Sequence, residues 1–215
     1  MCWQKHKPDL FAEETSAIRR RFSDVAINEL AGRIVLEGSF SVIRDGTLLR
    51  CYRLRVEFPT IYPDWIPDVF MLEPGVKYVA ERHIEANGRG CLCLPHEFLR
   101  YFPNGVRFNL YFDRLVAPWL VGQAFYDEHG RWPFQCRDHG KNGVLEGLAE
   151  MLDIADLRVV ERFARVLVRK KAARDSELCP CGSGRKLRDC HFELYHKCRS
   201  MLPGRAMRLY RKKFF

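Results

Sequence analysis

The chain has 215 residues, of which 47% are hydrophobic and 13% aromatic, so it is neither a disordered tail nor a miniprotein that depends on disulfides. Its formal net charge is +9, and the excess is concentrated: residues 169–215 hold 14 Lys and Arg against 4 Asp and Glu, whereas residues 1–168 hold 22 against 23. The main part of the chain is therefore no electrostatic binder of nucleic acid, while the C-terminal quarter can be one.

The sequence predicts a cytoplasmic protein without a membrane span. It contains no run of about eighteen apolar residues, and Lys5, Lys7 and Asp9 stand where a signal peptide would have an apolar stretch. In that compartment cysteines stay reduced, so the nine cysteines are expected to be thiols available for metal binding or nucleophilic chemistry rather than disulfides.

Residues 9–30 form the first predicted element, an amphipathic helix. Apolar side chains recur there at spacings of three, four and their sums, with Arg19, Arg20 and Arg21 between them.

Strands are expected next. Residues 34–43 and 48–58 are rich in alternating apolar and β-branched side chains, and Asp45-Gly46 between them predicts a hairpin turn. The apolar run at residues 69–72 predicts a third strand. One helix before an antiparallel β-meander indicates an α+β fold, and further helices are expected toward the C-terminus.

The second half of the chain reads mainly as loops and helices. Residues 76–105 are expected to form an ordered loop, and residues 108–125 a buried helix in which Pro118 marks either a break or a new first turn. Helices are also predicted at residues 144–152 and 156–173. We therefore divide the chain into a domain at 1–150, a helical connector at 151–175, and a C-terminal module at 176–215.

Two neighbouring motifs carry a family resemblance. The first is the proline- and aromatic-rich segment Phe58–Phe70, and the second is His83 followed by Gly90–Leu94 with two cysteines. Together with the order of elements, they resemble the ubiquitin-conjugating enzymes. Those enzymes carry Phe-Pro-x-x-Tyr-Pro-x-x-Pro-Pro-x-Val-x-Phe, then His-Pro-Asn, then Gly-x-Ile-Cys-Leu with the nucleophilic cysteine. The resemblance covers roughly residues 9–130.

Two cysteines compete for the nucleophile's position. With Cys93 as the nucleophile, Gly90 and His83 both fall at the family's spacing; with Cys91, Gly90 stands where an apolar residue belongs. We prefer Cys93 and keep Cys91 as the alternative nucleophile. In this register the family's asparagine is replaced by Glu85, which leaves open how the oxyanion of the transfer step is stabilised. Small buried cysteines on a turn are the other interpretation of the pair.

A later pair of motifs resembles the bacterial branch of these enzymes. Trp132-Pro133 is followed by His139-Gly140 and Gly143, a pattern seen in bacterial relatives after the cysteine. The resemblance implies that His139 serves as a base or hydrogen-bond donor for the cysteine, a role that suits its near-neutral pKa. The alternative is that His139 caps the helix expected to begin at Val144.

The residues from Cys179 to His191 predict a metal site. Three thiolates (Cys179, Cys181, Cys190) and the His191 imidazole form a closed tetrahedral ligand set of the kind that binds structural Zn²⁺. The segment resembles the SEC-C zinc motif found at the end of the SecA translocation motor. The basic and aromatic residues after Glu193 predict an arm that docks a protein, binds nucleic acid, or forms a solvated helix face.

Together the resemblances imply a ubiquitin-conjugating-like transferase with a SEC-C zinc module. Cys93 would accept a protein C-terminus as a thioester and pass it to an amine. The resemblance also implies a bacterial conjugation or antiviral (CBASS-type, anti-phage) system, with a ubiquitin-like protein or a cGAS-like nucleotidyltransferase as partner and an activating enzyme. The alternative is a catalytically inactive scaffold of the same fold that binds protein or nucleic acid through the zinc knuckle and the basic arm.

Overall fold

The computed structural model describes residues 2–44, 46–134 and 137–214. Its contacts divide the chain into two compact units: an N-terminal unit of residues 1–93 and 100–135, and a C-terminal unit of residues 94–99 and 136–215. Asp45 of the predicted hairpin turn lies outside the described residues, while Gly46 has the positive φ of 77° that such a turn requires. The predicted division into three segments stays a prediction.

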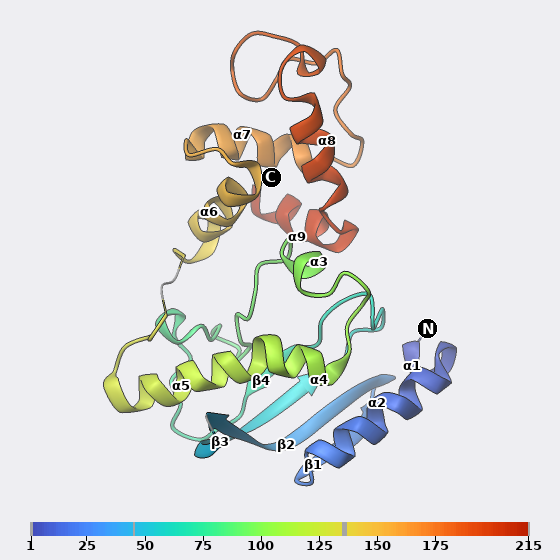
Figure 1. The fold of residues 1–215 in the computed structure, drawn as a ribbon, viewed down its shortest axis with the longest axis vertical. Helices are drawn as coiled ribbons and strands as arrows, with labels where there is room; N and C mark the ends of the chain where they lie inside the picture. The colour runs from blue at the N-terminus through green and yellow to red at the C-terminus, as the bar shows by residue number, and fades with distance from the viewer. Residues whose placement is uncertain (1, 45, 135–136, 215) are drawn as a thin grey trace. The chain divides into compact units, whose positions relative to one another are not determined.

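The N-terminal unit is built on one antiparallel sheet with the strand order β1-β2-β3-β4 (Figure 1). Its elements, in chain order, are α1 (Trp3–His6), α2 (Pro8–Arg21), β1 (Val25–Leu30), β2 (Arg33–Arg44), β3 (Thr47–Glu57), β4 (Asp68–Met71), the 3-10 turn η1 (Ala80–Arg82), α4 (Phe108–Tyr111), the π-helical turn η2 (Phe112–Val116) and α5 (Ala117–His129). The short helix α3 (Phe98–Tyr101) spans a boundary between the two units.

The helix predicted over residues 9–30 ends early. It stops at Arg21, and residues 25–30 form β1, which pairs antiparallel with β2 from Val25↔Gly38 to Leu30↔Arg33. The apolar spacing of this short segment fits both a helix and a strand, and pairing with β2 decides in favour of the strand. Gly38 allows the backbone at Asp24, just before β1, to lie close to β2, because a Cβ at position 38 would overlap the carbonyl oxygen of Asp24.

The other predicted strands are confirmed. Residues 34–43 and 48–58 correspond to β2 and β3, which pair along most of their length, and residues 69–72 correspond to β4. Because β1 precedes them, β4 is the fourth strand of the sheet rather than the third.

Helix α5 covers the inner face of the sheet, packing on β2 and β3 (Figure 1). Aromatic rings of Phe22, Phe40, Phe108 and Phe112 fill the space between the helices and the strands, with centroids 4.8–6.4 Å apart. Pro118 lies in the first turn of α5, where its missing N–H costs no helical hydrogen bond. Of the two predicted alternatives, a break in the helix or a new first turn, the structure places Pro118 in a first turn.

The C-terminal unit is helical. Its elements are α6 (Gly140–Leu152), α7 (Leu157–Leu167), the 3-10 turn η3 (Leu187–Asp189), α8 (Phe192–Ser200) and α9 (Gly204–Phe214). Helix α7 packs against α6, α8 and α9, and fully buried Phe163, Tyr195 and Tyr210 form its core. Within the described ranges, the structure contains no helix that is long and apolar enough to cross a membrane.

The helix predicted at 156–173 is shorter than expected. Asp156 caps its N-terminus by accepting a hydrogen bond of 2.8 Å from the Arg158 N–H. At the other end, Arg199 donates to the Leu167 carbonyl and Arg211 to the Val168 carbonyl, so side chains from α8 and α9 take up groups that a longer helix would use.

Candidate functional site

Cys91 stands at the end of a small hairpin that extends the sheet. The Glu85 N–H donates to the Arg89 carbonyl at 2.7 Å, and the Cys91 N–H donates to the His83 carbonyl at 2.8 Å. Gly88 makes the turn with a φ of 86°. The hairpin is joined to β4 through the Gly90 N–H, which donates to the Val69 carbonyl at 2.8 Å. Cys91 and Cys93 therefore come one and three residues after a residue that is bonded to the sheet.

Trp119 of α5 holds this hairpin from the inner side. A Cβ at position 90 would lie 3.0 Å from the Trp119 ring, and the indole N–H donates to the His83 carbonyl at 3.3 Å. A side chain at position 90 would therefore be tightly packed against the Trp119 ring, which would have to shift to make room. The role of Trp119 was missed in the sequence, because nothing in the local pattern pairs a helix residue with a glycine 29 positions earlier.

An ion triad lies on the hairpin surface beside Cys91. The Arg89 guanidinium contacts both carboxylate oxygens of Glu85 at 2.6 and 2.9 Å and reaches Asp68 at 3.1 Å. Hydrogen bonds with Glu85 raise the pKa of Arg89 above its ordinary value, so the guanidinium stays charged. The Cys91 Sγ lies 3.8 Å from a Glu85 oxygen. The Glu85 carboxylate is thus bound bidentately by the neighbouring arginine.

The second candidate thiol, Cys93, is half-buried, whereas Cys91 is exposed. Cys93 lies near the buried Tyr111 hydroxyl, whose pKa is raised first by burial and then by the charges of Cys93 and Asp68. That hydroxyl donates to the Pro67 carbonyl at 2.9 Å. Cys91, Cys93 and the Asp68–Arg89 pair therefore belong to one region of the N-terminal unit.

His83 is held by its backbone conformation and by contact with an aromatic ring. It has a left-handed backbone conformation with φ 52°, and its ring lies 4.8 Å from the Trp132 ring between centroids. Arg82 just before it is buried, donates to the Gln123 side chain at 3.0 Å, and accepts from it through its own carbonyl at 2.6 Å. The turn that carries His83 is thereby attached to α5.

His139 belongs to the C-terminal unit, where it is the N-cap residue of α6. Its side chain makes no capping hydrogen bond; the neighbouring Asp138 accepts bonds from Asn142 and from the His139 N–H instead, which lower the pKa of its carboxyl. His139 thus takes the N-cap position, as the alternative interpretation expects, but the helix begins at Gly140 rather than Val144 and the His139 side chain makes no capping hydrogen bond. Its predicted role toward Cys93 stays a prediction.

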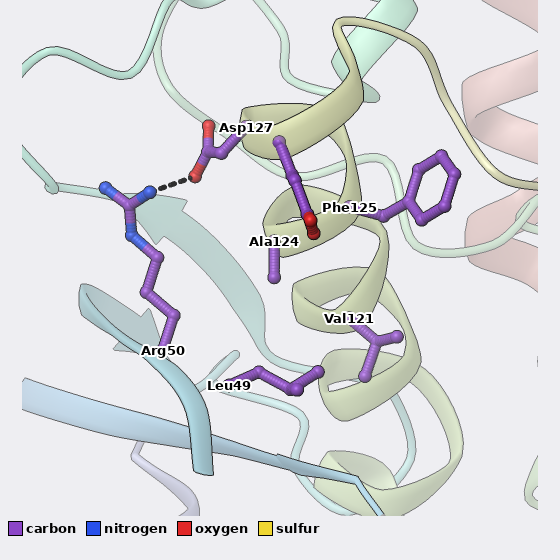
Figure 2. Close-up of a pocket in the computed structure, with 7 residues that line it drawn as sticks. Leu49, Arg50, Val121, Ala124, Phe125 and Asp127 are labelled. Carbon is purple, nitrogen blue, oxygen red and sulfur yellow. Dashed lines mark ion pairs between the residues drawn. The ribbon is translucent and has the colours of Figure 1, made fainter.

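A surface cavity of about 400 Å³ opens between β3 and α5 (Figure 2). On one side Arg50 forms an ion pair of 2.7 Å with Asp127, which also accepts from the Tyr52 hydroxyl at 2.6 Å. None of the predicted catalytic residues lines this cavity. Its lining consists of Leu49, Arg50, Val121, Ala124, Phe125, Asp127 and Glu128.

The predicted metal ligands come together in the C-terminal unit. The ligand atoms of Cys179, Cys181, Cys190 and His191 all lie within 4.8 Å of one another. The Cys181 and Cys190 sulfurs are 3.5 Å apart, and the His191 Nδ1 is 3.1 Å from Cys190 and 3.3 Å from Cys179. A tetrahedral zinc site has edges of about 3.6–3.8 Å. The four residues therefore fit zinc or another tetrahedrally bound metal ion.

The loop around these ligands is built for this arrangement. Gly182 and Gly184 have φ values of 87° and 74°, and the Cys179 N–H donates to the Arg185 carbonyl at 2.8 Å. Arg162 of α7 holds the loop by donating to the carbonyls of Pro180 and Cys181 at 2.7 and 3.0 Å.

The thiols of the cluster differ in acidity. Burial, together with the neighbouring thiols, raises the pKa of Cys179. At Cys181 burial, the largest single effect, favours the neutral thiol, but hydrogen bonds with Ser183, Cys179 and Cys190 together outweigh it and lower the pKa. Around Cys190, the Ser183 hydroxyl lies 3.4 Å and the Arg185 guanidinium 3.3 Å from the sulfur. Such outer contacts orient metal ligands and support their charge.

Residues 176–193 match the SEC-C motif, a stretch that contains all four ligands. No curated protein matches the chain. The chain therefore carries a SEC-C motif whose Cys and His side chains are gathered as a metal-binding cluster.

Many basic residues of the C-terminal unit have internal partners. Arg162, Arg199 and Arg211 donate to backbone carbonyls, and other arginines form ion pairs with acidic neighbours. Pairs of this kind include Arg137–Glu97, Arg137–Glu150, Arg165–Glu161, Arg169–Glu177, Arg174–Glu177 and Arg188–Asp189. Part of the positive charge of this unit is thus used to hold its helices and loops together.

Proposed function

We propose that this protein is a thioester-forming transferase of the ubiquitin-conjugating type, with Cys93 as nucleophile. The observation that carries the proposal is that two motif residues, His83 and Gly90, make the contacts that hold the hairpin preceding the cysteines. His83 supplies the carbonyl that binds both Cys91 and Trp119, and Gly90 gives Trp119 the space it occupies. The motif spacing thus has a physical basis in a hairpin that presents the thiols at the edge of the sheet.

The proposed reaction has two steps. The Cys93 thiolate attacks the carbonyl carbon of a donor thioester; a new carbon–sulfur bond forms, the donor's carbon–sulfur bond breaks, and the donor sulfur leaves as a thiolate. An acceptor amine then attacks the same carbon, the bond to Cys93 breaks, and the amine's proton passes to solvent or to a base. His139 is our candidate for that base.

Glu85 gives this site an unusual electrostatic character. A carboxylate cannot donate a hydrogen bond to an oxyanion, so it cannot replace the family's asparagine directly. The Arg89 fork neutralises Glu85, and each terminal guanidinium nitrogen carries a second N–H beyond those bonded to the two carboxylates. We propose that Arg89 stabilises the oxyanion in place of the asparagine.

The C-terminal cluster is proposed to bind one structural zinc ion. Cys179, Cys181, Cys190 and His191 would complete a tetrahedral coordination sphere, which leaves no position for a reacting water. Bound zinc would supply folding free energy to the module rather than chemistry.

The proposed partners follow from the resemblance. The donor is a ubiquitin-like protein or another processed protein C-terminus, delivered by an activating enzyme, and the acceptor is a protein amine, for example on a cGAS-like nucleotidyltransferase. A bacterial antiviral system in the cytoplasm is the proposed setting.

The deciding experiment uses the full chain with the proteins encoded by neighbouring genes, including any activating enzyme and ATP. A covalent adduct that thiols cleave should form with the unchanged chain and with Cys91→Ala, and disappear with Cys93→Ala. Loss of the adduct only in Cys91→Ala would assign the nucleophile to Cys91. If no neighbouring protein forms an adduct, the transferase proposal fails.

One observation favours the alternative of an inactive scaffold: both oxygens of Glu85 are already bound by Arg89 at the position of the missing asparagine. Such a scaffold would bind protein or nucleic acid through its C-terminal unit. It predicts no adduct, together with salt-dependent binding of a polyanion that Lys170→Ala and Lys171→Ala weaken.

A further inference from the structure

The cavity between β3 and α5 has no part in the proposed reaction. Its volume of about 400 Å³ falls within the range of about 300–1,000 Å³ that is typical of small-molecule sites. All of its lining residues belong to the N-terminal unit and come from β3 and α5. None of them is a proposed catalytic residue, so the cavity raises the question of a separate ligand.

A β-bulge at Leu49 brings two consecutive side chains to this cavity. Val42 of β2 pairs with Arg50 of β3. The next residue of β2, Ile43, pairs with Leu48, so the register skips Leu49. Neighbouring side chains of a regular strand point to opposite faces, yet Leu49 and Arg50 both line the cavity (Figure 2). Bulges re-aim side chains in this way beside functional sites.

Part of the cavity wall is apolar. It consists of Leu49 from β3 and of Val121, Ala124 and Phe125 from α5. Leu49 is 45% exposed, so a large share of its side chain is in contact with water. A ligand with an apolar body would remove this surface from water, which is favourable.

The polar side of the cavity is formed by a charged network. Asp127 pairs with the exposed Arg50 at 2.7 Å and with the buried Arg82, and it accepts from the Tyr52 hydroxyl at 2.6 Å. Burial, and then Asp127, raises the pKa of Tyr52, so the hydroxyl keeps its proton and remains a donor. Arg82 also donates to the neutral Gln123 side chain at 3.0 Å. Two guanidinium groups thus share one carboxylate, and the network carries one positive charge in excess.

This excess charge lies where a ligand can reach it. The Asp127 side chain is only 17% exposed, so solvent screens the network less than it screens an ordinary surface pair. Arg50 uses Nη1 to pair with Asp127, and among the described residues its Nη2 has no hydrogen-bond partner. Guanidinium groups bind carboxylates through charge-assisted hydrogen bonds of matching geometry. The network therefore favours a ligand with a carboxylate head group.

Glu128, which also lines the cavity, opposes an anion. Its side chain is 77% exposed, and its ion pair with His129 is long, at 3.8 Å. At this exposure solvent and counter-ions screen most of its charge, so it acts only weakly on a ligand bound at Arg50. The sign of its effect still separates two classes of ligand, because Glu128 repels an anion and attracts a cation.

We propose that this cavity binds a small amphipathic carboxylate, with the head group on Arg50 and the apolar body between Leu49 and α5. The proposal goes beyond the proposed transferase activity and does not depend on it, since no lining residue takes part in the thioester chemistry.

The probe is octanoate, titrated into the isotope-labelled full chain at neutral pH and followed through amide chemical shifts. Saturable shifts should appear at the residues of β3 and α5 that line the cavity. Octylammonium has the same apolar chain and the opposite charge, and it should bind at least about tenfold more weakly. Equal affinities of the two probes, or no saturable shifts with octanoate, would overturn the proposal.

Two matched pairs of variants assign the binding site. Leu49→Ala should weaken octanoate binding about fivefold, whereas Leu48→Ala removes the same atoms from a residue outside the cavity and should leave binding unchanged. Arg50→Gln should weaken binding about tenfold. Its control is Arg53→Gln, since Arg53 lies on the same strand, pairs with Glu37 at 3.1 Å and does not line the cavity. An equal loss in the variant and its control, in either pair, would contradict the site.

A third variant covers the case in which Arg50→Gln does not fold, because that substitution also breaks the pair with Asp127. Urea unfolding shows which variants keep their stability. Glu128→Gln changes an exposed carboxylate outside the network and should strengthen octanoate binding about twofold. Unchanged or weaker binding in folded Glu128→Gln would show that no anion binds beside it, and the proposal would fail.

Discussion

Trp119 lies where a side chain on Gly90 would have to go. The Trp119 ring is 3.0 Å from the position of a Cβ at residue 90, and its indole N–H binds the His83 carbonyl on the same hairpin. A helix residue thereby couples the core of the N-terminal unit to the turn that presents the two thiols.

Gly90→Ala should therefore destabilise the protein by about 1–3 kcal/mol, because the added methyl displaces a packed indole. Urea unfolding measures this loss. Gly204→Ala is the control, since the nearest atom to its Cβ is a flexible Arg208 nitrogen at 3.9 Å. Trp119→Phe should recover part of the loss in the double variant; additive effects of the two substitutions would contradict the contact.

Removal of metal should unfold the C-terminal unit selectively. Structural zinc contributes on the order of 10 kcal/mol of binding free energy, and the four ligands here join a loop to the start of α8. A strong chelator or Cys190→Ser should therefore lower the melting temperature and release one metal ion per chain, measured by elemental analysis. Cys198→Ser, outside the cluster, should keep the metal. A chain purified with no bound metal and an unchanged melting curve in chelator would refute the metal site.

Acid should weaken the C-terminal unit through His96. Burial, the largest effect, lowers the pKa of His96, with Arg137 acting in the same direction and Glu97, Glu150 and the Gly147 backbone opposing it. Below the ordinary pKa of about 6.5, the unfolded chain binds a proton that the folded unit excludes. The contribution of His96 is therefore complete above that pH and is lost as the pH falls toward the folded pKa.

The measurement is the free energy of unfolding of the C-terminal unit at pH 7.5 and at pH 5.5. His96→Gln should be less stable at pH 7.5 and should show a smaller decrease on acidification than the unchanged chain. His6→Gln, at an exposed position outside this network, should behave like the unchanged chain. An identical decrease in His96→Gln would show that other groups cause it.

Substitutions in the ion triad should change the rate of the proposed transfer while changing the free energy of unfolding little. Glu85, Arg89 and Asp68 side chains are 36–41% exposed, so the pairs contribute at most about 1 kcal/mol. Glu85→Asn introduces a neutral donor and should increase the rate of the proposed transfer from Cys93, whereas Arg89→Gln leaves Asp68 and Glu85 unbalanced and should reduce it. Single-turnover transfer rates are the readout, with urea unfolding as the control. Equal rates in both variants would remove the triad from the mechanism.

The sequence allowed the sheet and the metal ligands to be predicted because both depend on local signals. Alternation marked β2 and β3, and the spacing of Cys179, Cys181, Cys190 and His191 marked the cluster. Residues 25–30 were assigned to a helix, since six residues with a helix-compatible spacing cannot show which neighbour will pair with them.

The contacts that hold Leu94–Leu99 within the C-terminal unit were not predictable in the same way. Tyr210 binds His96 across 114 positions of sequence, and Glu97 meets Arg137 across 40. A buried histidine or a paired glutamate has no distinctive neighbours in sequence. The basic residues of the last quarter pointed to an external partner, whereas Arg199 and Arg211 bind the carbonyls that end α7.

The chain leaves the N-terminal unit after Cys93 and returns to it at Arg100. This limits where the chain can be truncated to give one unit without part of the other. A chain cut close to Gln135 would lack α6, α7, α8 and α9 and would still contain Leu94–Leu99. The buried Phe98 and the His96 ring would then face water. The C-terminal unit therefore cannot be removed whole by truncating the chain, because its smaller piece lies within the sequence of the other unit.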